Sequence, residues 1–79
     1  MCVEFVIDGE KFEWTKNIDI LTESIDGKPC LVFHNTKTGE NQTKVCQSEA
    51  QSNDLKSQVR QKLIDEGFMQ ERIIKIKTE

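Results

Sequence analysis

The sequence has little of what catalytic and metal-binding sites are built from. It contains one histidine, His34, and three cysteines without the C-x2-C spacing of most zinc sites. Its four glycines lie far apart, so no glycine-rich phosphate loop is present. These shortages argue against nucleophilic catalysis by a Cys/His pair, against a zinc centre and against a nucleotide site. We therefore expect a protein that is not an enzyme and that uses no cofactor.

Long apolar runs and a strong excess of one charge are also missing. No run approaches the roughly 20 apolar residues of a membrane helix, and the first ten residues, MCVEFVIDGE, lack the basic start of a secretory signal. The 11 Lys and Arg nearly balance the 14 Asp and Glu, which gives a net charge of −3 and no basic footprint for nucleic acid. We expect a cytoplasmic protein that does not bind membranes, and unpaired cysteines agree with a reducing compartment.

The 79 residues allow one small domain, residues 1–79. A chain of this size buries only about 60–65% of the surface that its unfolded form exposes, so the core is thin. Apolar residues make up 35% of the chain, but they fall in patterned runs between turn residues, which favours a folded domain over disorder. We expect little room for a deep pocket.

The first patterned run, VEFVIDGEKFEW, predicts a β-hairpin from Val3 to Trp14. Asp8-Gly9 suits its turn, because glycine accepts the positive φ of a type I′ turn. A turn at Gly9-Glu10 fits as well, and since the two pairings differ by two residues, the same side chains share a face. In both, Val6 points outward. The inward side chains are Val3, Phe5, Ile7, Phe12 and Trp14.

The next stretch, Asn17–Pro29, supports two interpretations. Ile18 and Ile20 alternate as in a short strand, whereas Leu21 and Ile25 are spaced as in one helical turn. The residues IDGKP at the end of the stretch predict a turn, after which proline bars a helix.

Residues 30–46 predict a second hairpin. A three-residue loop, Lys37–Gly39, with glycine in the left-handed position sets the pairing of its two strands. On the buried side this register pairs Leu31 with Val45 and Phe33 with Thr43. The opposite side holds Val32, His34, Gln42 and Lys44.

The same register places Cys30 directly across from Cys46. A disulfide between them is sterically conceivable but needs an oxidising compartment, and the alternative is two free cysteines that act as small apolar residues. The redox state of this pair stays open at this point. His34 is four residues from Cys30, about 13 Å along a strand, which is too far for one zinc ion or for a catalytic dyad.

The last third of the chain predicts a helix and then a strand. Ser48 with Gln51 fits a capping box, although Ser52 or Asn53 is a second candidate start. The helix stripe is Leu55, Val59 and Leu63, and Gly67 is placed to end the helix. The strand is Arg72–Lys77. Together the runs predict an α+β domain, in which two hairpins and this C-terminal strand form an antiparallel sheet of four or five strands with one helix packed on one face.

Such a helix leaves the other face of the sheet open to solvent. That face is expected to hold Val6, Val32, His34, Ile73 and Lys75, an apolar centre within a charged rim, which is typical of a modest protein-binding surface. A solvated face with scattered Val and Ile is an equally simple interpretation. We predict a small regulatory binding protein whose partner is another protein. By analogy with short acidic phage and mobile-element proteins, the partner would be part of a host machine.

A nucleic-acid-associated module is the alternative hypothesis. Its basic set would be Lys56, Arg60, Arg72, Lys75 and Lys77. Acidic residues lie among these positions, and the five aromatic residues are all expected in the core rather than free for base stacking. The oligomeric state stays open, a homodimer included.

Overall fold

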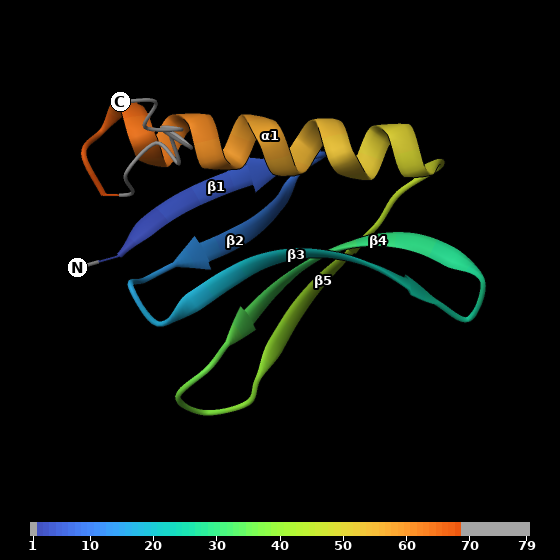
Figure 1. Ribbon diagram of the computed structural model, residues 1–79, viewed down its shortest axis with the longest axis horizontal. Coiled ribbons are helices and arrows are strands. Elements are labelled where there is room, and N and C mark those ends of the chain that lie inside the picture. The colour runs from blue at the N-terminus through green and yellow to red at the C-terminus, as the bar shows by residue number, and fades with distance from the viewer. Residues whose placement is uncertain (1, 69–79) are drawn as a thin grey trace, which may run out of the picture.

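The computed structural model describes residues 2–68, which form five strands followed by one helix (Figure 1). The elements are β1 (Val3–Ile7), β2 (Glu10–Trp14), β3 (Ile18–Ile25), β4 (Lys28–Asn35), β5 (Asn41–Val45) and α1 (Glu49–Asp65). All pairings between these strands are antiparallel, so the predicted α+β class is confirmed. The predicted strand Arg72–Lys77 lies outside the described residues.

The first hairpin has the register set by a turn at Asp8-Gly9. Its pairs include Val3 with Trp14 and Phe5 with Phe12. Asp8 and Gly9 have φ values of 51° and 82°, which is the type I′ geometry that matches the twist of the flanking strands. The alternative turn, one residue later, is not formed.

The ambiguous stretch before Pro29 is a strand. β3 pairs with β4 along its whole length, from Ile18 opposite Asn35 to Ile25 opposite Lys28. Asp26 and Gly27, with φ values of 53° and 77°, form a second type I′ turn. Eight consecutive cross-strand pairs outweigh the local helical spacing of two apolar residues in this stretch.

The predicted register of β5 is wrong by one residue. The loop has four residues, Thr36 to Gly39, and not three, because the amide of Asn35 donates to the carbonyl of Glu40 at 2.8 Å. Leu31 therefore lies opposite Lys44 and Phe33 opposite Gln42. A slip of one residue turns every side chain of a strand to the other face, so Val45 and Thr43 are exposed and not buried.

The strands form two sheets, β1-β2 and β3-β4-β5, where the sequence predicted one. The chain turns back after Trp14, whose indole N–H donates to the carbonyl of Ile18 at 2.8 Å. The hairpin then packs face to face on the second sheet, and the ring of Phe33 lies 6.0 Å from that of Phe5 and 5.1 Å from that of Phe12. Stacking buries the aromatic side chains of both sheets, whereas one wide sheet under a single helix would leave part of them in water.

The helix begins and ends as its sequence predicts. The Ser48 side chain accepts the amide of Gln51 at 3.1 Å, and this confirms Ser48 as the N-cap. Gly67 has φ +83°. Its amide donates to Ile64 and the amide of Phe68 donates to Leu63, at 3.0 and 2.9 Å, which is the Schellman arrangement.

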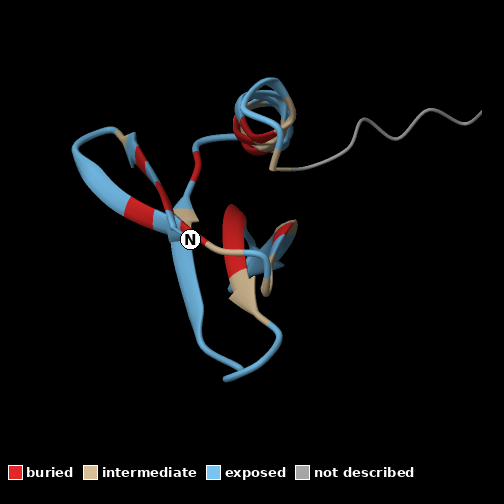
Figure 2. Ribbon diagram, turned by 90° about the vertical axis from the view of Figure 1, so that its left-hand side faces the viewer, coloured by how far each residue is buried: buried red, intermediate tan, exposed pale blue. Residues whose placement is uncertain are grey.

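The core lies between the two sheets and α1. Its helix residues are Val59 and Leu63, and Ser52 is the buried polar residue beside them. Leu55 is only partly buried at the border. Figure 2 looks almost along α1 and shows its buried residues on the side that faces the strands. The strand residues of the core are Val3, Phe5, Phe12, Trp14, Ile20, Leu31 and Phe33, with Cys46 just beyond β5.

Candidate protein-binding surfaces

One face of the β3-β4-β5 sheet points away from the first hairpin and α1, and we call it the outer face. Side chains alternate along each strand, so the register assigns its members. They are Asp19, Leu21, Glu23 and Ile25 from β3, Lys28, Cys30, Val32 and His34 from β4, and Asn41, Thr43 and Val45 from β5. Ile25 is 38% exposed and Val45 is 53% exposed, which makes them two of the three exposed large apolar residues among residues 2–68.

The side chains at the centre of the outer face are buried. Val32 and Cys30 are each only 1% exposed, although they belong to the face that the helix does not cover. Leu21 and Thr43 flank Val32 on the neighbouring strands. Val32 was predicted as a contact residue. Its burial indicates that it supports the face from below, and its contact with a partner stays a prediction.

His34 lies on the outer face, partly exposed, as predicted. Its Nδ1 is 2.6 Å from the side-chain oxygen of Asn41, which is its cross-strand neighbour. This contact fixes the ring against β5 and makes the imidazole part of the polar rim. Within the described part of the chain, no group of three His, Cys, Asp or Glu side chains is arranged to hold a metal ion.

Val6 belongs to a different surface. It is 70% exposed on the outward side of the first hairpin, opposite Lys11 on β2. Since the hairpin is a separate sheet, Val6 and His34 do not share one sheet face as the sequence suggested. The other two predicted contact residues, Ile73 and Lys75, lie outside residues 2–68.

A shallow groove runs between β1 and α1 beside Val6. Its volume is about 230 Å³, which is room for a few side chains. The residues that line it are Phe5, Val6 and Ile7 from β1 and Leu55, Gln58, Val59 and Lys62 from α1. No pattern in the sequence predicts this groove, because it exists only where the separate hairpin meets the helix.

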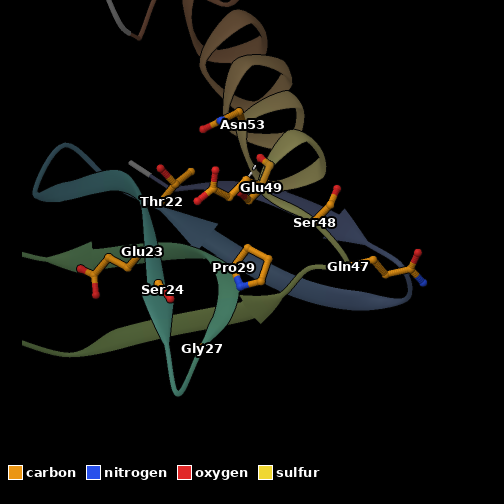
Figure 3. Close-up of a pocket in the computed structure, with 10 residues that line it drawn as sticks. Thr22, Glu23, Ser24, Gly27, Pro29, Gln47, Ser48, Glu49 and Asn53 are labelled. Carbon is orange, nitrogen blue, oxygen red and sulfur yellow. Dashed lines mark hydrogen bonds between the residues drawn. The ribbon is translucent and has the colours of Figure 1, made fainter.

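A larger hollow, of about 470 Å³, lies between the β3-β4 turn and the start of α1 (Figure 3). Its lining is polar, and Glu23 and Glu49 are among the residues that line it. The one buried polar side chain there, Ser52, already donates its hydroxyl to the carbonyl of Glu49 at 2.9 Å. The negative charges disfavour an anion at the helix N-terminus. No buried polar side-chain atom in this hollow lacks a hydrogen-bond partner.

The cysteines are free. Cys30 points to the outer face, whereas Cys46 lies in the core on the opposite side of the sheet, and its amide pairs with the carbonyl of Pro29. Cys30 faces Val45 and not Cys46, so the predicted alignment of the two cysteines is wrong for the same reason as the register. Burial raises the pKa of the Cys46 thiol above its ordinary value.

The basic residues that the structure describes do not gather into one patch. Lys56 and Arg60 flank the buried stripe of α1 and are partly covered. Lys62 is exposed and lies with its Nζ 5.0 Å from the centre of the Phe5 ring. Arg72, Lys75 and Lys77 lie outside the described residues, so the nucleic-acid hypothesis stays a prediction.

Neither a membrane-spanning helix nor a similar known protein indicates a class for this protein within the described residues. In residues 2–68 no helix is long and apolar enough to cross a membrane. Comparison of the chain with protein-family models, with curated proteins and with solved structures finds no match. The surfaces described above therefore carry the functional argument alone.

Proposed function

We propose that the protein is a small, non-catalytic, cytoplasmic binding protein that docks the outer face of its β3-β4-β5 sheet on another protein. The supporting observation is the position of Val45 and Ile25. Both are exposed on a face whose centre is already filled by Val32 and Cys30. An apolar surface on a paired sheet loses little backbone conformational entropy when a partner covers it, because its strands are already held by their neighbours.

The charges around this face indicate what the partner should carry. Asp19 and Glu23 border Leu21 on β3, and the whole chain has a net charge of −3. We expect a partner that offers an apolar patch with basic residues beside it, since opposite charges across an interface speed association and exclude wrong partners. By analogy with other short acidic proteins, this partner is a component of a host machine.

A charge placed in the apolar part of the face tests the proposal. Val45→Lys puts an ammonium group where apolar contact is expected, and Ser57→Lys puts the same charge on the exposed side of α1 as a matched control. Neither position is buried, so both variants should keep their stability to within about 0.5 kcal/mol.

Affinity capture from the native host with the wild type and both variants provides the measurement. The expected result is a protein that the wild type and Ser57→Lys retain and that Val45→Lys loses. Equal retention by all three proteins would remove the outer face as the contact surface.

The nucleic-acid alternative is separated by an electrophoretic shift at low and high salt. Binding through phosphates weakens steeply as salt rises, because counterions are released. Micromolar or tighter binding that collapses with salt, and that Arg60→Gln weakens, would replace the protein-partner proposal by the nucleic-acid one.

A further inference from the structure

The groove between β1 and α1 lies along the edge of β1 that pairs with no other strand of residues 2–68. In a two-residue hairpin the residues that flank the turn form a hydrogen-bonded pair, so every second residue of β1 bonds to β2. The pairs of this kind are Ile7 with Glu10, Phe5 with Phe12 and Val3 with Trp14. Glu4 and Val6 therefore direct their amide and carbonyl groups away from β2. Among the described residues neither has another backbone partner.

The opposite edge of the same hairpin is different. On β2 the outward amide of Glu13 donates to the side-chain oxygen of Gln42 on β5, at 3.0 Å. A side chain thus occupies one of the two outward amides of β2, whereas within residues 2–68 neither outward amide of β1 has a hydrogen-bond partner. Open and apolar strand edges are the ones that take up another strand.

The groove supplies side-chain contacts next to this open edge. Phe5 and Ile7 line it from β1, and Leu55 and Val59 line it from α1. A strand added along β1 would direct alternate side chains into this apolar space. It would also cover Val6, which is otherwise 70% exposed.

Lys62 decides which strand fits. It stands over the ring of Phe5 and makes no ion pair within residues 2–68. A second copy of the chain, paired antiparallel so that Glu4 of each copy meets Val6 of the other, would put Phe5 on the two-fold axis. The two Lys62 side chains would then come close together, and like charges repel. An acidic residue in the added strand would instead be attracted.

We propose that the β1–α1 groove binds an extended segment of a partner protein, which adds to the free edge of β1 and presents apolar side chains and one acidic side chain to the groove. The apolar side chains pack mainly on the partly buried Ile7 and Leu55, above the buried Phe5 and Val59, and the carboxylate meets Lys62. This surface is separate from the outer face, so it stands or falls independently of the function proposed above.

The test uses two blocked synthetic heptapeptides and the full chain. One has the sequence Thr-Val-Thr-Glu-Thr-Val-Thr, and the other has Lys in place of Glu. Nuclear magnetic resonance of the labelled protein should show that the Glu peptide shifts the amide signals of Glu4 and Val6 and slows their hydrogen exchange. The Lys peptide should bind more weakly by a factor on the order of three or more, as expected for one exposed ion pair, and Lys62→Glu should reverse this preference.

Two proline variants identify the edge that is used. Val6→Pro removes an outward amide of β1, and Lys11→Pro removes an outward amide of β2 at the directly opposite position. Neither amide is needed within the hairpin, so both variants are tolerated by the ladder. Val6→Pro should abolish binding and Lys11→Pro should preserve it. If Val6→Pro does not fold, the Lys62→Glu exchange of preference still decides.

Several results would overturn the proposal. They are no signal change at Glu4 and Val6 with either peptide, equal binding by both peptides, and slow exchange of these two amides without peptide. If the exchange of these two amides becomes slower as the protein concentration is raised, a second copy of the chain occupies the groove. Slow exchange independent of concentration would assign it to the chain's own residues 69–79.

Discussion

Replacement of Phe33 by Ala should weaken the packing between the two sheets. Phe33 is 1% exposed and contacts the rings of Phe5 and Phe12, so it is the side chain through which β4 holds the first hairpin. Truncation of a buried Phe costs about 3–5 kcal/mol. A domain of this length has a free energy of unfolding of roughly 4–12 kcal/mol, so the variant should lose about a quarter or more of its stability.

The assay is urea denaturation followed by two signals. Trp14, the single tryptophan, reports the hairpin by fluorescence, and circular dichroism reports α1. The expected result is a lower midpoint for Phe33→Ala in both signals, whereas Val6→Ala, at an exposed position, should change stability by less than about 0.5 kcal/mol. A double-mutant cycle of Phe12→Leu and Phe33→Leu should add a coupling of about 0.5–1.5 kcal/mol for the stacked rings. A loss below about 1 kcal/mol for Phe33→Ala would refute the face-to-face packing of the sheets.

Three further predictions concern the helix and the core. Leu63→Ala should lower the free energy of unfolding by about 2–5 kcal/mol in urea denaturation, because Leu63 is 0% exposed. Leu55→Ala should cost less, because Leu55 is only partly buried. Equal costs for the two variants would contradict this difference in burial. Gly67→Val should lower the melting temperature, since φ is +83° at this helix end; an unchanged melting curve would place the helix end elsewhere. The raised pKa of Cys46 means that the folded state keeps a proton that the unfolded chain releases above its ordinary thiol pKa of about 8.5, so stability should fall as pH rises through that value. Cys46→Ala should flatten this slope in denaturation measured from about pH 7.5 to about 9.5, and an equal slope would exclude the thiol as its cause.

Local signals in the sequence were sufficient for most elements. Asp8-Gly9 predicts its turn because glycine accepts the required positive φ, and Ser48 and Gly67 mark the two ends of α1 by the hydrogen bonds that they make possible. Each of these features depends on residues within a few positions of each other. The α+β class follows from them, since two hairpin patterns and one helical stripe have few ways to bury their apolar sides.

Features that depend on distant residues could not be predicted in the same way. A loop of four residues rather than three moves β5 by one position, and this turns Lys44 inward, where its side chain is only 15% exposed and pairs with Asp8 at 3.3 Å. That contact links β5 to the turn of the first hairpin. Nothing near Lys44 in the sequence indicates it, because the turn lies more than thirty residues away.

The candidate surfaces depend on both local and distant residues, so only their local features could be predicted. His34 was placed on an open face by alternation alone, and it lies there. Val32 obeys the same alternation but is covered by its neighbours. An alternating pattern predicts the face on which a side chain lies and not how far its neighbours cover it. The β1–α1 groove needs the split into two sheets, which no run of the sequence indicates.

The split into two sheets also creates the strand edge at which we propose that a partner segment binds. Five strands in one sheet have two edges, whereas two sheets have four. The amide of Glu13 on the β2 edge is occupied by Gln42. The Lys residue that could protect β5 is instead turned inward to Asp8. Natural sheets protect their edges with charge or proline. The edge of β1 carries Glu4 but also the exposed Val6, and it lies beside a groove in which Lys62 makes no ion pair within residues 2–68. For this edge we therefore favour cover by a partner segment over exposure to water.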